Sequence, residues 1–230
     1  MTELRILAGG GIAASMRAIA PRFERATGNQ VNFFFGTTPE LIAEATSGAK
    51  FDAGVLPHEV YADVQARAHF TAQTPIDIAY VGLGVAVRAG NAKPDIHSPD
   101  ALRSTLISAK SLATIPESAA GMQIMRLFEK LSISKEMARK TRVKKAPPDV
   151  VQSLASGETE LGMFLANVFK IAPEVDLLTP FPDELQQKVN FAAAVAKNTS
   201  LSSVASEFIA CLKTAESAAL IRENGMSPFA

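Results

Sequence analysis

The chain has 230 residues, 23 Lys plus Arg, 23 Asp plus Glu and one cysteine, Cys211. A formal net charge of zero argues against a uniformly basic surface for nucleic acid. A single cysteine excludes an internal disulfide and a multi-cysteine metal site. We therefore expect no nucleic acid partner and no metal, in a chain long enough for one large domain or two small ones.

The first predicted element is a buried strand that stops at three glycines and turns into a helix. The strand begins at Leu4, and Gly9, Gly10 and Gly11 follow it. A helix start leaves N–H groups unpaired and carries the positive end of the helix dipole, so glycines there let an anion approach bare amides. A tight turn from strand to helix would need the same glycines. The spacing does not match the GxGxxG dinucleotide fingerprint, because Ala14 stands three positions after Gly11.

Two further strand-and-helix units follow. Residues 30–35 are predicted as a strand, and Thr37 is predicted as the N-cap of the helix after it. Residues 51–56 are predicted as a third strand, with a helix over residues 57–67. Alternating strands and helices of these lengths indicate an α/β fold with a mostly parallel sheet. Ligands of such sheets bind beyond the carboxyl ends of the strands.

Two long apolar runs interrupt this alternation. Residues 76–87 exceed an ordinary strand of about five or six residues, so we expect them to leave one sheet and enter another. Residues 189–196 form a second run of this kind. We therefore predict two lobes joined by two crossing strands, with a ligand cleft between the lobes. Lobe 1 would contain residues 1–80 and 195–230, and lobe 2 would contain residues 81–194.

The second lobe is predicted to repeat the alternation of strands and helices. Helices are expected over residues 99–109, 119–131 and 148–156, and strands over residues 111–114, 141–145, 161–164 and 175–178. The last thirty residues carry helices near 201–212 and 215–224 and are expected to return to the first lobe.

The order and spacing of these segments resemble the type 2 periplasmic-binding-protein fold, in the branch of ABC importer receptors similar to molybdate-binding proteins. The resemblance covers essentially the whole chain and rests on residues 7–11, 23–28, 35–38, 48–52, 84–90, 119–121 and 157–162. It implies two α/β lobes, each a mostly parallel sheet flanked by helices, that close by a hinge on a small anion. It also implies a monomer without a cofactor, and the membrane component of an ABC transporter as a partner.

In molybdate-binding relatives, hydroxyls and helix-start amides hold the oxyanion, and the resemblance places these roles on this chain. The serine positions fall on Gly11 and Thr38, the backbone donors on Ala120 and Val150, and the tyrosine on Leu165. Two of the three side-chain donors are thus absent, which disfavours molybdate, because a site built to hydrogen-bond its ligand loses discrimination without its donors. Other residues expected around an anion are Gly10, Thr37, Ser118, Ala119 and Gly121.

The segment Gly84–Gly90, followed by Pro94, resembles a sub-branch of general solute receptors that also contains aconitate isomerase. This resemblance implies a small carboxylate ligand. A solute-binding protein is the first hypothesis, and an isomerase of the aconitate type acting on a di- or tricarboxylate is the alternative. A ligand sensor without a transporter is a third.

Four residues outside the helix starts are candidates for chemistry or binding. His58 follows the third strand and could move a proton, although a surface histidine at a helix start is the preferred interpretation. Glu117 is the other candidate base. Arg88 could bind a carboxylate bidentately or pair with a surface acid. Asn167 could offer its amide to the ligand or cap a helix.

No apolar run approaches the roughly 20 residues that span a bilayer, so no membrane insertion is expected. The chain also begins without a basic and then apolar leader. We expect a periplasmic protein if a signal peptide has been removed, and a cytoplasmic protein if Met1 is the native start.

Overall fold

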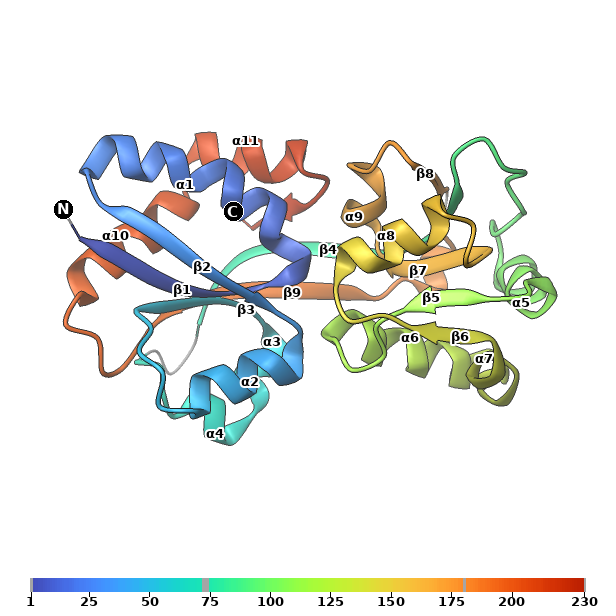
Figure 1. The fold of residues 1–230 in the computed structure, drawn as a ribbon, viewed down its shortest axis with the longest axis horizontal. Coiled ribbons are helices and arrows are strands. Elements are labelled where there is room, and N and C mark those ends of the chain that lie inside the picture. Colours follow the sequence, from blue (N-terminus) through green and yellow to red (C-terminus); the bar gives the residue numbers. More distant parts are fainter. Residues whose placement is uncertain (1, 72–74, 180, 230) are drawn as a thin grey trace. The chain divides into compact units, whose positions relative to one another are not determined.

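The computed structural model describes residues 2–71, 75–179 and 181–229. The chain folds into two compact units (Figure 1). Unit 1 consists of Met1–Tyr80 and Asn190–Ala230, and unit 2 consists of Val81–Val189. Within the described ranges, no helix combines the length and the apolar character needed to cross a bilayer.

A mixed sheet, parallel at β1, β2 and β3, forms the centre of unit 1. Its strands are β1 (Glu3–Gly9), β2 (Gln30–Gly36), β3 (Ala53–Pro57), β9 (Lys188–Val195) and β10 (Ser227–Pro228). β1 lies between β2 and β3 and runs parallel to both, and β9 pairs with β3 in the antiparallel sense. All five residues of β3 are buried, as expected for a strand covered on both faces. Gly9 pairs with Gly36, so β1 and β2 end side by side.

Helices cover both faces of this sheet. They are η1 (Gly10–Ile12, a 3-10 turn), α1 (Ala13–Thr27), α2 (Thr38–Thr46), α3 (His58–Ala62), α4 (Val64–Arg67), α10 (Ser202–Leu212) and α11 (Ala215–Glu223). α1, α10 and α11 lie on one face, and α2, α3 and α4 lie on the other (Figure 1). Met16, Ile19 and Phe23 are buried on one side of α1. The Phe23 ring meets Phe208 of α10 edge to face, with centroids 5.3 Å apart.

Unit 2 is built around a mixed sheet. Its strands are β4 (Ile76–Arg88), β5 (Leu112–Thr114), β6 (Thr141–Val143), β7 (Leu161–Leu165) and β8 (Val175–Leu178). Its helices are α5 (Pro99–Ser108), α6 (Ala119–Lys130), α7 (Ser134–Lys140), α8 (Pro147–Ala155), α9 (Ala166–Lys170) and the 3-10 turn η2 (Asp183–Leu185). β5 runs parallel to β6 and β7, and β4 runs antiparallel to β7 and β8.

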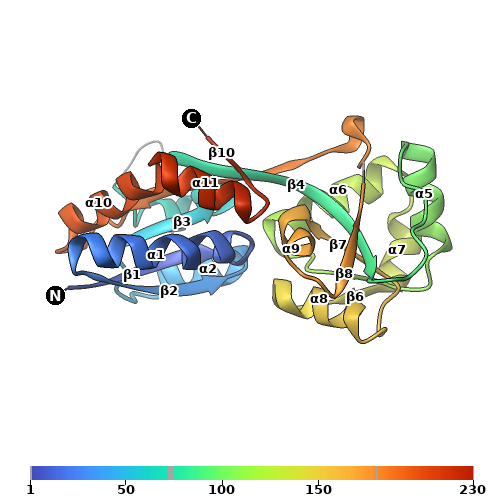
Figure 2. The same ribbon diagram turned by 90° about the horizontal axis from the view of Figure 1, so that it is seen from above.

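The chain passes from one unit to the other inside β4 and inside β9. β4 is one continuous strand of 13 residues (Figure 2), and Tyr80 and Val81 on it belong to different units. In the same way, Val189 and Asn190 divide β9. The apolar run over residues 76–87 is therefore a single long strand that serves the cores of both units.

Two details of the predicted elements are wrong. The helix expected over residues 57–67 is two short helices, because Asp63 has an extended conformation (φ −69°, ψ 123°) between them. The Asp63 side chain then accepts a hydrogen bond from the Ala66 N–H and starts α4. The first helix does not follow the strand directly either, since the 3-10 turn Gly10–Ile12 comes first.

Candidate functional site

Three helical segments begin where the parallel strands of unit 1 end. We call this the carboxyl edge of unit 1, and it is marked by Gly9, Gly36 and Pro57 at the ends of β1, β2 and β3. η1 begins directly after Gly9, α2 begins two residues after Gly36, and α3 begins directly after Pro57. A helix start leaves N–H groups without an intrahelical acceptor, although in α2 Pro39 carries no N–H and Glu40 belongs to the capping box with Thr37. The carboxyl edge of unit 1 is thus rich in hydrogen-bond donors.

The glycines at the first of these starts have different reasons to be there. A Cβ on Gly9 would lie 2.7 Å from Cε1 of Phe191 and 3.1 Å from Cδ of Pro57, so close packing requires glycine at this position. Gly10 and Gly11 form the 3-10 turn, and Gly11 is buried. None of the three has a positive φ angle. Close packing therefore explains why residue 9 is a glycine. Gly10 and Gly11 lie at the carboxyl edge of unit 1, where the sequence predicted them.

The two threonines at the start of α2 differ in what their hydroxyls do. The Glu40 carboxylate accepts hydrogen bonds from the Thr37 N–H and the Thr37 hydroxyl, each at 2.7 Å. These bonds, the backbone bond first, lower the pKa of Glu40. Thr38 is 5% exposed, and its Oγ1 has no hydrogen-bond partner within the described part of the chain. The Thr37 donors are thus already bonded within the protein, whereas the Thr38 hydroxyl is not bonded to any described residue.

His58 at the start of α3 has a carboxylate partner that the sequence did not reveal. Its Nε2 lies 2.6 Å from Oδ1 of Asp77 on β4. The two side chains are 48% and 43% exposed. The imidazole thus has a carboxylate partner at Nε2 and remains open to solvent.

In unit 2, the start of α6 is shaped by Ser118 and Gly121. The Ser118 hydroxyl donates to the Ile115 carbonyl (2.7 Å) and accepts from the Gly121 N–H (3.0 Å). A Cβ on Gly121 would lie 1.9 Å from the Ile115 oxygen, so only glycine fits there. Ser118 and Gly121 build the turn, and the amides of Ala119 and Ala120 in the first turn are left without intrahelical acceptors.

The remaining predicted residues of unit 2 fall in two places. We define the carboxyl edge of unit 2 by Thr114, Val143 and Leu165, the last residues of β5, β6 and β7. Leu165 lies on this edge, and Asn167, 2% exposed, follows it in α9. Val150 is buried in the first half of α8, and Glu117 is exposed just before the Ser118 cap.

Arg88 does not join this group. β4 pairs antiparallel with β7, so that Leu83 faces Leu165 and Ala86 faces Gly162. Arg88 therefore lies beyond the amino end of β7, at the edge opposite Leu165. A Cβ on Gly157, just after the end of α8, would lie 3.7 Å from Nη1 of Arg88. Arg88 is therefore separated from the other candidate ligand contacts of unit 2.

Thr114, the last residue of β5, is a further buried hydroxyl at the carboxyl edge of unit 2. Thr114 is fully buried, and its Oγ1 finds no hydrogen-bond partner among the residues described. A sequence signal was present, since a threonine ends a predicted strand shortly before a predicted helix start. The described residues contain no group of three or more His, Cys, Asp or Glu side chains that could hold a metal ion.

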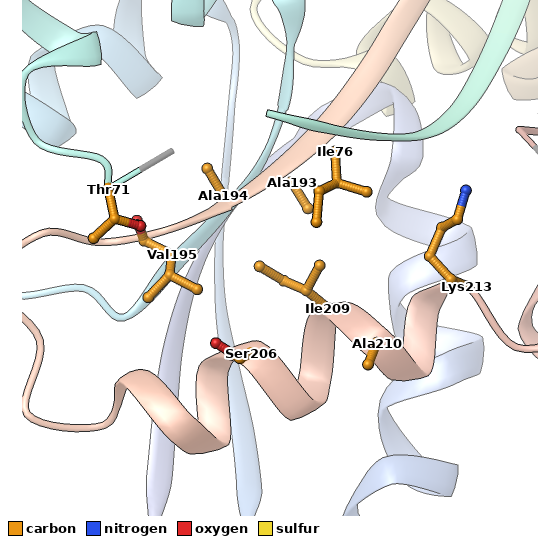
Figure 3. Close-up of a pocket in the computed structure, with 9 residues that line it drawn as sticks. All are labelled: Thr71, Ile76, Ala193, Ala194, Val195, Ser206, Ile209, Ala210 and Lys213. Carbon is orange, nitrogen blue, oxygen red and sulfur yellow. The ribbon is translucent and has the colours of Figure 1, made fainter. Parts of the chain in front are cut away.

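Two hollows in unit 1 lie away from the predicted residues. One, of about 300 Å³, lies between β9 and α10, where Ala193, Ile76 and Ile209 approach one another and Lys213 stands at one side (Figure 3). The other, of about 440 Å³, is lined in part by Asp52 and His69. Neither contains a residue of the carboxyl edge of unit 1, so neither belongs to the candidate site.

Comparison with known proteins gives consistent matches over the whole chain. Residues 4–227 match the family described as bacterial extracellular solute-binding protein. An aconitate isomerase from Pseudomonas sp. is 28% identical over 234 residues, covering 99% of this chain and 88% of that protein. The molybdate-binding protein ModA of Mycobacterium bovis is 23% identical over 232 residues, covering 96% and 83% of the two chains.

A solved structure shows the likeness of fold. The sulfate-binding protein SubI from Mycobacterium tuberculosis H37Rv matches with a TM-score of 0.76 at 16% identity. The match covers 99% of this chain and 87% of that one.

Proposed function

Because the chain belongs to the bacterial extracellular solute-binding protein family, we propose that it is a receptor that captures a small organic carboxylate. The proposed ligand contacts are the helix starts at the carboxyl edges of the two units. In unit 1 these are Gly10, Gly11 and Thr38, and in unit 2 they are Ala119 and Ala120. Delivery to the membrane component of an ABC transporter in the periplasm follows from this proposal.

The observation that carries the proposal is the buried hydroxyl of Thr38, which has no hydrogen-bond partner among the described residues. A buried hydroxyl without a partner costs free energy, and a ligand that accepts its hydrogen bond recovers that cost. Thr38 is the first residue of α2, where its own N–H has no intrahelical acceptor and the helix dipole favours an anion, whereas Pro39 carries no N–H and Glu40 belongs to the capping box with Thr37. The hydroxyl and the N–H of Thr38 at one helix start would together donate to an anion.

A carboxylate fits the proposed contacts better than a compact oxyanion does. The family resemblance implies that Gly11 takes the position of a hydroxyl in molybdate-binding relatives and that Leu165 takes the position of their phenol. A tetrahedral oxyanion would leave some of its oxygens without donors, which is costly for a buried charge. A carboxylate with a carbon skeleton can place its charged end on the amides and its methylene groups against Leu165.

A ligand panel with matched variants tests this proposal. Thermal shift and calorimetry would compare cis-aconitate, trans-aconitate, citrate and succinate with molybdate, tungstate and sulfate. We expect a carboxylate to raise the melting temperature, because a ligand that binds only the folded state stabilises it. Thr38→Val should weaken binding by about 1.5–3 kcal/mol, the value of a hydrogen bond to a charged group.

The matched control is Thr46→Val, on the same helix. The Thr46 hydroxyl already donates to the Ile42 carbonyl (2.8 Å) at the far end of α2, so this variant should bind as the wild type does. Strong stabilisation by molybdate or tungstate with no effect of any carboxylate would overturn the proposed ligand class.

One observation favours a second function, an isomerase of the aconitate type. His58 and Asp77, 2.6 Å apart, have the arrangement of a general base oriented by a carboxylate. In such a reaction the base removes a proton from the methylene carbon of cis-aconitate, and amide donors stabilise the resulting negative charge. The negative charge is shared by the former methylene and vinyl carbons, and a proton added to the former vinyl carbon leaves the double bond at the former methylene carbon in the trans geometry.

Proton nuclear magnetic resonance of cis-aconitate incubated with the protein in D2O tests the isomerase. The enzyme should produce trans-aconitate and incorporate deuterium at the methylene carbon, and His58→Gln should abolish both. Binding of cis-aconitate without either change identifies a receptor that is not an enzyme.

A further inference from the structure

The backbone of Thr114 is hydrogen-bonded within the unit 2 sheet, but its side-chain hydroxyl has no hydrogen-bond partner among the described residues. It is the last residue of β5, where it pairs with Val143 of β6. Its carbonyl accepts a hydrogen bond from the Lys144 N–H at 2.9 Å. Its side chain is fully buried, and Oγ1 has no partner in the described residues. A valine of nearly the same shape would pack there without the cost of an unpaired hydroxyl.

The direction of the Thr114 side chain follows from the register of the unit 2 sheet. A Cβ on Gly162 would lie 2.7 Å from Cδ1 of Leu154, so Gly162 faces α8. Ala113 pairs with Gly162 in the parallel sense and faces α8 too. Side chains alternate between the faces of a strand. Thr114 therefore points to the opposite face, where α6 lies (Figure 1).

The start of α6 offers fewer donors than a carboxylate can accept. The Ser118 hydroxyl already takes the Gly121 N–H, which leaves the amides of Ala119 and Ala120. An ionised carboxylate has about four acceptor positions. A third donor would fill one of the carboxylate's remaining acceptor positions. It would have to lie on the same face of unit 2, at the end of the strand that leads into α6.

We infer that the Thr114 hydroxyl is a ligand contact that donates a hydrogen bond to the carboxylate group received at the start of α6. The inference rests on the proposed function and deepens it, because it assigns to unit 2 a side-chain donor that its helix-start alanines lack. Hydrogen bonds to a charged acceptor are short and strong. Thr114 would thus add affinity and would fix the orientation of the bound carboxylate group.

The test compares Thr114→Val and Thr114→Ser with Thr159→Val. Thr159 is also a buried threonine of unit 2, but its hydroxyl is 3.0 Å from the Ser153 hydroxyl. Melting temperatures without ligand and calorimetric Kd values for cis-aconitate, trans-aconitate, citrate and succinate would be measured for each protein. Thr114→Ala serves as a second deletion of the hydroxyl if the valine variant does not fold.

We expect Thr114→Val to keep or raise the melting temperature without ligand and to weaken carboxylate binding at least tenfold. Thr114→Ser, which keeps a hydroxyl, should bind within a few-fold of the wild type. Thr159→Val should melt at a lower temperature and bind as the wild type does. This pattern would distinguish the Thr114 hydroxyl, which contributes to ligand binding, from the Thr159 hydroxyl, which contributes to the stability of the fold.

Two results would overturn the inference and leave the proposed function intact. One is wild-type affinity in both Thr114→Val and Thr114→Ala. The other is a fall in melting temperature for Thr114→Val as large as that for Thr159→Val, with unchanged affinity, which would reveal a structural partner such as a buried water. Failure of the wild type to bind any of the four carboxylates would overturn the proposed function and the inference together.

Discussion

The carboxylate of Glu40 accepts hydrogen bonds from both the N–H and the hydroxyl of Thr37, each at 2.7 Å. An acidic side chain of the protein thus already occupies part of the start of α2. Folding uses these donors to hold the helix end, and the hydroxyl of the adjacent Thr38 stays without a partner in the described residues. Of the two threonines, only Thr38 therefore has a hydroxyl that could donate a hydrogen bond to a ligand without first breaking a bond within the protein.

The first prediction concerns acid stability. The pKa of Glu40 is lowered by the bonds from Thr37, so the folded state favours the ionised carboxylate. The resulting stabilisation is complete above the unfolded pKa, near 4.3, and is lost as the pH falls through the lowered folded value. Denaturant unfolding should show that Glu40→Gln is less stable than the wild type at pH 7. The two proteins should converge at the acid end, and a difference that grows on acidification would contradict the assignment.

The second prediction concerns the turn before α6. Gly121→Ala should destabilise the protein by about 3 kcal/mol, because the new Cβ would lie 1.9 Å from the Ile115 oxygen, a backbone atom that cannot swing away. Gly28→Ala is the matched control. Gly28 has φ 71° but no atom within 4 Å of its added Cβ, so it should cost only about 1 kcal/mol. Urea unfolding measures both, and equal losses would show that the turn adapts.

The third prediction concerns Tyr61, which is buried between the sheet of unit 1 and α3. Its hydroxyl lies 3.0 Å from the Gly54 carbonyl, and burial raises its pKa well above 10.0. The neutral form is therefore favoured in the folded state, and stability present below about pH 10 should be lost as the pH rises further. Tyr61→Phe should cost about 1 kcal/mol at pH 7.

The control for Tyr61 is Tyr80→Phe, since Tyr80 is only partly buried. Unfolding from pH 8 to pH 11 should lose more stability in the wild type and in Tyr80→Phe than in Tyr61→Phe. Parallel curves for all three proteins would show that Tyr61 ionises without cost in the folded state.

Several features of the fold could be predicted from the sequence, because each of them depends on a local pattern of apolar residues. The family resemblance and the α/β fold class are confirmed. Met16, Ile19 and Phe23 recur at spacings of three and four residues, which is typical of one helical face, and all three are buried. The apolar run at residues 76–87 predicted an unusually long strand, and β4 has 13 residues. The spacing and length of apolar runs were enough to predict these two features, because both features depend only on which residues are buried.

Other features depended on contacts that the sequence does not announce. Asp63 divides an apparently continuous helical pattern because its side chain caps a second helix at Ala66. Thr37 and Thr38 look alike in sequence, yet only the structure shows that Glu40 takes the donors of Thr37. Asp77 and His58 are 19 residues apart and meet only when β4 is in place. Side-chain partners of this kind arise from tertiary packing, so local pattern could not supply them.

The last prediction concerns Arg88, a cation that the sequence placed among the carboxylate contacts. The pairing of Leu83 with Leu165 fixes the position of β4 relative to the carboxyl edge of unit 2. Arg88 is five residues further along β4, and at about 3.3 Å per residue in a strand it stands roughly 17 Å from that edge. A small di- or tricarboxylate held at the start of α6 cannot span this distance. Arg88→Gln should therefore leave the calorimetric Kd of every carboxylate that binds unchanged, whereas Thr38→Val weakens it. A loss of affinity in Arg88→Gln comparable to that in Thr38→Val would place the ligand at the opposite edge of unit 2 and would contradict the proposed site.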